Sequence, residues 1–149
     1  NGLTAIGDQQ LAATHSLIAQ NHPYGSADQL QKNIMDDRAH GVFNGQVYVH
    51  KPAQLTNASQ LNRNLLRSPK ARIDTKPELD IVADNVKCAH GATVSQLAPD
   101  ELFYLQSRGI NRDQAQRLLV YAFEMEIIEP ITVAPLRERM IQYIQQWTV

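Results

Sequence analysis

The chain has 149 residues, of which 43% are hydrophobic and 19% are charged, and its formal net charge is −1. This length allows one ordinary domain or two small ones, and the composition is that of a globular protein. The balanced charge supplies no field that would attract nucleic acid or a membrane surface. A single cysteine excludes an internal disulfide framework and fits a reducing compartment, and no apolar run approaches the roughly 20 residues that span a bilayer.

The sequence pattern of residues 1–97 is typical of a β domain. Its opening "NGLTAIGDQQ" is not a signal peptide, because no basic segment precedes an apolar one. Apolar residues then alternate with period two, which places each set on one face of a strand. The clearest sets are Val47 and Val49, then Leu79, Ile81 and Ala83, then Val86, Cys88 and His90.

Polar segments separate these runs and predict turns and loops at 21–29, 54–70 and 74–78. Helical periodicity is nearly absent, so crossover helices of an α/β fold are not expected. Many short strands without helices suggest a sandwich, a barrel or a parallel β-helix. We favour the β-helix, because each of its coils needs only a few inward apolar residues, although no strict sequence repeat is visible.

The pattern becomes helical over residues 98–149, which we assign to a small all-α domain. Pro99 suits a first helical position, Gly109 suits the end of that helix, and Asn111 with Gln114 resembles a capping box that opens the next. Pro130 ends the second helix, and a third is predicted from near Val133 to Trp147. The predicted inward faces are Ala115, Leu118, Leu119, Ala122, Met125 and Ile128 in the second helix and Leu136, Met140, Tyr143, Ile144 and Trp147 in the third.

The pair Cys88 and His90 is the most distinctive candidate site. On a strand their Cα atoms are about 6.6 Å apart and their side chains share a face, so both could reach one metal ion. They could also be the nucleophile and base of a thiol hydrolase, although catalytic dyads usually converge from separate elements. On spacing alone, a buried cysteine with a histidine at a strand end is the favoured interpretation.

Two other groups of charged residues are candidates for a functional site. The cationic residues Arg63, Arg67, Lys70, Arg72 and Lys76 lack interleaved aromatic residues, so they predict a solvated face and not a nucleic-acid site. If the β domain is a β-helix, carboxylates could serve a carbohydrate-active enzyme, which needs two that face each other across a cleft. The candidates are Asp74, Asp80 and Asp84, but few aromatic residues are present to stack on sugars.

Residues 62–123 resemble the SufB/SufD family of iron–sulfur cluster assembly proteins. The similarity is carried by the phrases "SPKARIDTKPEL", "NVKCAHGATV" and "LFYLQSRGI", which follow one another in the order of the family's signatures. The wording "KCAHGAT" is more similar to SufD than to SufB. The resemblance implies a right-handed parallel β-helix, expected over residues 1–97, followed by a C-terminal helical domain over 98–149.

The resemblance also implies a function in the SUF system. The protein would be a cytoplasmic, non-catalytic scaffold (in the plastid stroma, if it comes from a plant or alga) that pairs with SufB through its β-helix. Its helices would dock the ABC-type ATPase SufC, with Tyr104, Arg108, Gly109 and Ile110 at the start of that region. His90, with Cys88 beside it, would hold nascent cluster or iron at the SufB interface.

The single cysteine agrees with a shared site, because Fe–S clusters usually need about four thiolate or imidazole ligands. We therefore expect no stably bound cofactor in this chain and a transient cluster or iron atom in the full complex. The family's N-terminal helical region and earlier β-helix coils are missing, so we expect a fragment produced by cloning or proteolysis. Its open β-edge, or the surface that meets SufB, would support a homodimer in isolation.

Overall fold

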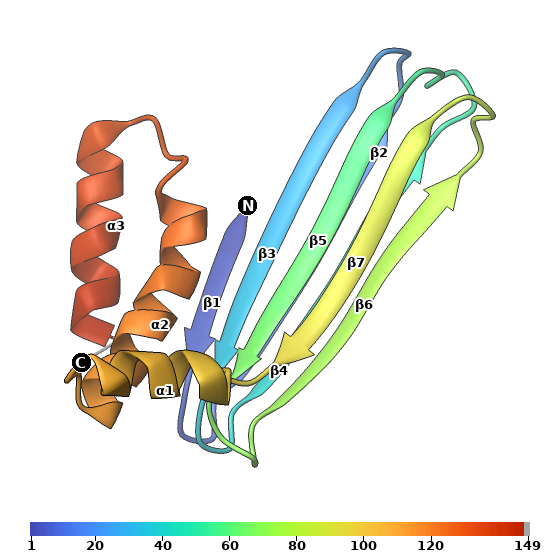
Figure 1. Cartoon of the computed structure of the whole chain (residues 1–149). Coiled ribbons are helices and arrows are strands. Elements are labelled where there is room, and N and C mark those ends of the chain that lie inside the picture. The colour runs from blue at the N-terminus through green and yellow to red at the C-terminus, as the bar shows by residue number, and fades with distance from the viewer. Residues whose placement is uncertain (148–149) are drawn as a thin grey trace. The chain divides into compact units, whose positions relative to one another are not determined.

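The computed structural model describes residues 1–147. It divides into two compact units, Asn1–Ser95 and a second unit that begins at Gln96. The first unit contains all the strands and the second contains three helices (Figure 1). No helix in this described part is long and apolar enough to cross a membrane.

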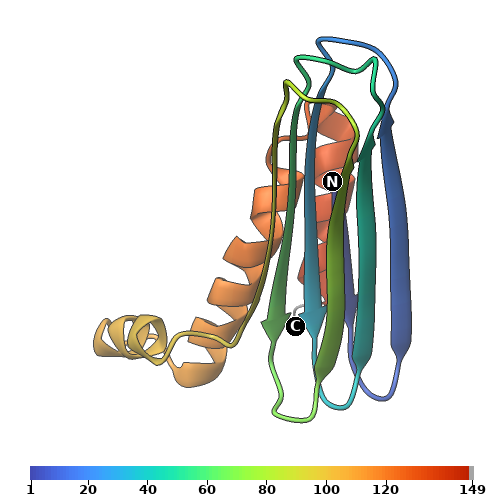
Figure 2. The same ribbon diagram turned by 90° about the vertical axis from the view of Figure 1, so that its right-hand side faces the viewer.

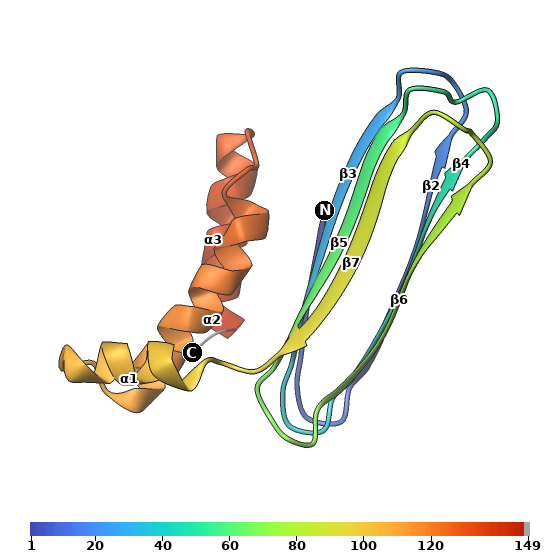
Figure 3. The same ribbon diagram turned by 45° about the vertical axis from the view of Figure 1, so that its right-hand side comes forward.

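The first unit is a parallel β-solenoid, as predicted. The chain alternates between two sheets, so that each coil adds one strand to each sheet, and every strand pair is parallel. Figure 3 shows the sheets as two layers joined by bends. One sheet has the order β1 (Gly2–Ile6), β3 (Ser26–Met35), β5 (Asn57–Leu66) and β7 (Lys87–Ser95), and the other has the order β2 (Leu11–Gln20), β4 (His40–Val49) and β6 (Arg72–Ile81).

Successive coils of the solenoid begin in register with one another. Leu11 at the start of β2 pairs with His40 at the start of β4, and His40 pairs in turn with Arg72 at the start of β6. The coils repeat in backbone geometry and not in residue type. Residues that stack on one another need only point the same way, into the solenoid or out of it. This is why no sequence repeat is visible.

Alternate residues point into the space between the two sheets. On β4 this inward row includes Phe43, Val47 and Val49, all fully buried. Val47 and Val49 form an apolar cluster with Ala53, Ala58 and Ala83. Period-two alternation therefore identifies the inward face correctly.

Another part of the interior is polar and is held together by side-chain amides. Asn33 Nδ2 donates to Asn64 Oδ1 (2.6 Å), and Asn64 Nδ2 donates to Asn62 Oδ1 (2.6 Å). The network extends to Gln31, whose Nε2 donates to Asn33 Oδ1 (3.0 Å), and to Thr75, whose hydroxyl donates to Asn62 Oδ1 (2.6 Å). Buried polar groups are costly unless they are paired, and stacked coils supply the partners.

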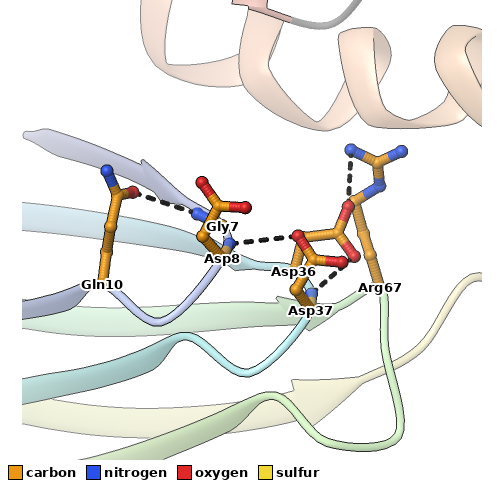
Figure 4. Close-up of polar contacts among 6 residues, drawn as sticks. All are labelled: Gly7, Asp8, Gln10, Asp36, Asp37 and Arg67. Atoms are coloured by element: carbon orange, nitrogen blue, oxygen red, sulfur yellow. Dashed lines mark hydrogen bonds and ion pairs between the residues drawn. The ribbon is translucent and has the colours of Figure 1, made fainter.

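The bends at one end of the solenoid also stack on one another (Figure 4). Asp8 and Asp37 adopt left-handed backbone conformations, with φ values of 53° and 48°, which aspartate tolerates better than most residues. The Asp8 backbone N–H donates to Asp37 Oδ2 (3.0 Å), and the next coil adds an ion pair between Arg67 and Asp36 (3.1 Å).

The loop predictions were wrong in three places. Segment 54–70 contains β5, segment 21–29 includes the start of β3, and segment 74–78 lies within β6. Segment 54–70 reads as a loop because its inward residues are amides and not aliphatic residues. Pro77 fits β6 because β6 is the last strand of its sheet, where one side of the backbone needs no hydrogen bond.

The second unit consists of α1 (Pro99–Ser107), α2 (Arg112–Ile128) and α3 (Ala134–Trp147). Figure 2 shows the three helices from a second direction. Pro99 is the first residue of α1, and Gly109, with a φ of 86°, follows its C-cap. Asn111 caps α2 by accepting a hydrogen bond from the Gln114 N–H (2.9 Å). The predicted helix limits are thus confirmed to within a residue or two.

The predicted inward faces of the helices were only partly right. Ala115, Ile128 and Ile144 are buried as expected. Leu118 is 47% exposed and Tyr143 is 66% exposed, whereas Val120 and Ile127 are buried in a way the prediction did not foresee. Ala122 and Leu136 are exposed as well, Leu119, Met125 and Met140 are half-buried, and the prediction for Trp147 concerns a side chain outside the described part.

Candidate functional site at the last coil

Strand β7 carries both residues of the candidate pair and is the last strand of its sheet. It pairs with β5 alone among the described strands. Cys88 is in register with Ala58 and His90 with Gln60, and both of these β5 residues are buried in the interior. Cys88 and His90 therefore continue the inward row of β5, which agrees with the same-face prediction.

The two side chains differ in their surroundings. Cys88 is a half-buried free thiol that packs against the apolar cluster of Val47, Val49 and Ala58. His90 lies one position further along the row and is exposed, because no later coil covers it. The cysteine thus lies against the apolar cluster, whereas the imidazole is exposed.

This site is chemically incomplete within the described residues. No group of three or more His, Cys, Asp or Glu side chains among them is arranged to hold a metal ion. Thiolate and imidazole are suitable donors for iron. The pair can supply at most two ligands, so any iron atom or cluster held there needs donors from elsewhere.

Gln60 is the residue at this site that sequence reasoning missed. It is 1% exposed, in register with His90, and its Oε1 has no hydrogen-bond partner among the described residues. The signal for it was available, because Ala58, Gln60, Asn62 and Asn64 alternate with period two. The polar character of the segment concealed that alternation.

The four residues proposed for partner binding lie together at the end of α1. Tyr104 is 57% exposed, and the Arg108 guanidinium carbon lies 5.4 Å from the centre of its ring, within the range of a cation–π contact. Gly109 is exposed in its left-handed conformation, and Ile110 is half-buried. They form one small aromatic and cationic surface.

The geometry gives no support to the alternative enzymes. Asp74 and Asp80 both point outward from β6 and are six residues apart, which separates their Cα atoms by about 20 Å. Glycosidase carboxylates are about 5–10 Å apart. Asp84 lies beyond the end of β6 and is exposed. Cys88 and His90 lie two residues apart on one strand, whereas the two groups of a thiol hydrolase dyad usually converge from separate elements.

Other histidines and cations are dispersed over the surface. His40 Nε2 contacts Asp74 Oδ2 (2.8 Å), and the ring of His50 packs edge-on against Tyr48. In the cationic segment, Lys76 pairs with Glu78 (2.8 Å) on the outer face of β6. These local pairs agree with the predicted solvated face.

Comparison with known proteins defines the class to which this solenoid belongs. Residues 1–123 match the family described as "SUF system FeS cluster assembly, SufBD core domain". The chain therefore belongs to the SufBD family of iron–sulfur cluster assembly proteins. This confirms the resemblance carried by the motif around Cys88 and His90.

Within the family the chain is most like SufD. It is 55% identical over 147 residues to the iron–sulfur cluster assembly SufBD family protein slr0076 of Synechocystis, covering 99% of this chain and 32% of that protein. It is 38% identical over 146 residues to the iron–sulfur cluster assembly protein SufD of Escherichia coli, covering 98% and 34%. Protein ABCI7, chloroplastic, of Arabidopsis thaliana is 42% identical over 139 residues, covering 93% and 29%. The chain thus spans about a third of the length of these relatives.

Proposed function

We propose that this chain belongs to a SufD-like scaffold that supplies His90 as a ligand to nascent iron–sulfur cluster or iron at an interface with a second subunit. The observation that carries the proposal is the position of His90, which is exposed on the inward row of an edge strand, beside a half-buried cysteine. A metal site built on His90 is incomplete within this chain, and a second chain would complete it by adding further ligands.

The second subunit would be a SufB-like protein that meets the last coil. An edge strand presents unpaired backbone N–H and C=O groups, and β7 holds this position in its sheet. Pairing at this edge would bring the partner's ligands to His90. The same edge would let the isolated chain form a homodimer.

The helical unit would dock a SufC-like ATPase. Exposed Tyr104 and Leu118 support this, because apolar and aromatic side chains that remain solvent-exposed are typical of interaction surfaces. Arg108, Gly109 and Ile110 complete the surface at the end of α1. In this arrangement the ATPase performs the chemistry of hydrolysis, the scaffold is not an enzyme, and the cluster is its transient cargo. The compartment would be the cytoplasm, or the plastid stroma in a plant or alga.

The experiment is anaerobic reconstitution of the full complex with wild-type protein, His90→Ala and Cys88→Ser. We expect His90→Ala to lose most of the bound iron and sulfide while the complex still assembles, because a ligand is removed from an exposed position without disturbing the core. Cys88→Ser measures what the neighbouring thiol contributes, and Ala89→Ser, on the exposed outer face of β7, is the matched control. Normal iron and sulfide in His90→Ala would remove His90 from the site.

A further inference from the structure

A row of polar side chains leads through the solenoid to His90. Gln29 of β3, Gln60 of β5 and His90 of β7 occupy the same register on three neighbouring strands. Gln29 Nε2 donates to Ser16 Oγ (2.9 Å), and Gln60 Nε2 donates to Gln29 Oε1 (2.8 Å). Both amide nitrogens in the row therefore donate to residues of earlier strands and not toward β7.

This direction leaves one acceptor unused. Gln60 Oε1 is buried and has no hydrogen-bond partner in the described part of the chain. The nitrogen and oxygen of a primary amide point in different directions from the same carbon. Nε2 is held by the preceding coil, which leaves Oε1 available to the following one, where His90 lies one strand away, at a spacing of about 4.8 Å.

The Gln60 amide is also held in place from the opposite sheet. A Cβ atom added at Gly45 would lie 2.6 Å from Gln60 Nε2 and 2.5 Å from Phe43 Cζ. Such distances are shorter than any normal contact, so the amide packs tightly over the Gly45 backbone beside the Phe43 ring. It has little room to turn its oxygen elsewhere.

A buried acceptor without a partner has lost its hydrogen bonds to water and gained none in return, which calls for an explanation. The exposed His90 ring can supply one, because an imidazole carries an N–H on one of its two nitrogens in the neutral form. Its exposure leaves this side chain room to change rotamer. The ring can therefore turn its N–H toward Gln60 and leave its other nitrogen free.

We infer that Gln60 is a positioning residue for His90: its Oε1 accepts a hydrogen bond from the imidazole N–H, fixes the tautomer and orients the free nitrogen toward iron or cluster at the interface. Metal-binding histidines usually make such a second contact, and its removal typically costs 10–100-fold in metal affinity. The part of this inference that concerns iron rests on the proposed function, whereas the contact between Gln60 and His90 does not.

The test uses the intact metal-free protein with 15N-labelled histidine. An exposed imidazole N–H exchanges rapidly with water, whereas a hydrogen-bonded one is protected and gives an observable signal. We expect a protected N–H from His90 in the wild type, its loss in Gln60→Met, and its retention in Gln60→Glu, whose carboxylate still accepts. Gln31→Met is the matched control, because Gln31 is a buried amide of the same sheet that stacks below Asn62 and not below Gln60.

Anaerobic iron loading of the complex provides the second readout. Gln60→Met is expected to weaken loading about 10-fold or more, with Gln31→Met close to wild type. A His90 N–H signal that is absent from the wild type, or unchanged in Gln60→Met, would overturn the inference even if His90→Ala abolishes loading. A signal that behaves as expected together with normal loading of His90→Ala would instead overturn the proposed function and leave the contact standing.

Discussion

The solenoid and the helical unit bury their side chains by different means. In the solenoid, backbone register places inward residues of successive coils on top of one another, so even Asn62 and Asn64 are buried with partners. The three helices leave large apolar side chains such as Phe103, Leu118 and Tyr143 exposed. Interior positions of the solenoid should therefore control stability, and exposed positions of the helices should control association.

The largest expected effect separates two phenylalanines, one from each unit. Phe43 is fully buried between the sheets, so Phe43→Ala should lower the free energy of unfolding by about 3–5 kcal/mol. Phe103 is 72% exposed, so Phe103→Ala should change it by about 0.5 kcal/mol or less. Chemical denaturation of the intact protein measures both, and equal losses would contradict the contrast between the units.

An intermediate effect is expected for the amide network. Asn64→Leu removes the amide that joins Asn33 and Asn62 and that donates to the Thr93 carbonyl (3.0 Å). Leaving such groups unpaired should cost about 1–3 kcal/mol. Asn57→Leu is the control, since Asn57 points outward on the same strand and is exposed. Full stability of Asn64→Leu in denaturant unfolding would show that the network contributes nothing.

The smallest effect on stability is expected at the exposed helix surface. Leu118→Gln should alter the free energy of unfolding by about 0.5 kcal/mol or less, because the side chain is nearly half exposed. The same change should weaken binding of the SufC-like ATPase in a calorimetric titration, if this surface docks it. Unchanged binding would place the docking surface elsewhere.

The sequence predicted the parts of the fold that follow from local chemistry. Pro99, Gly109 and Asn111 marked helix ends correctly because a cap or a fixed dihedral acts within a few residues. Alternation at Val47 and Val49 identified the inward face of a strand. Segment 54–70 was wrongly predicted as loop because its inward positions are amides, and only stacking of coils supplies their partners.

The candidate site was predictable only in part, for the same reason. The motif indicated His90 and Cys88, and strand periodicity placed them on one face. The role we infer for Gln60 depends on a neighbour that lies a whole coil away along the chain and is brought into register by the pairing of β5 with β7. Spacing along the chain carries no information on that contact. Leu118 and Tyr143 were predicted to be buried and are exposed. Apolar periodicity identifies the apolar face of a helix but does not indicate whether another element covers that face.

The central claim is that His90 is a direct ligand, and pulsed electron paramagnetic resonance of the reduced, cluster-loaded complex tests it most directly. With 15N-histidine incorporated only into the SufD-like chain, we predict a strong nitrogen hyperfine coupling in the wild type and none in the cluster that His90→Ala retains. A spectrum without directly coordinated histidine nitrogen, in a complex that carries its full cluster, would contradict the account.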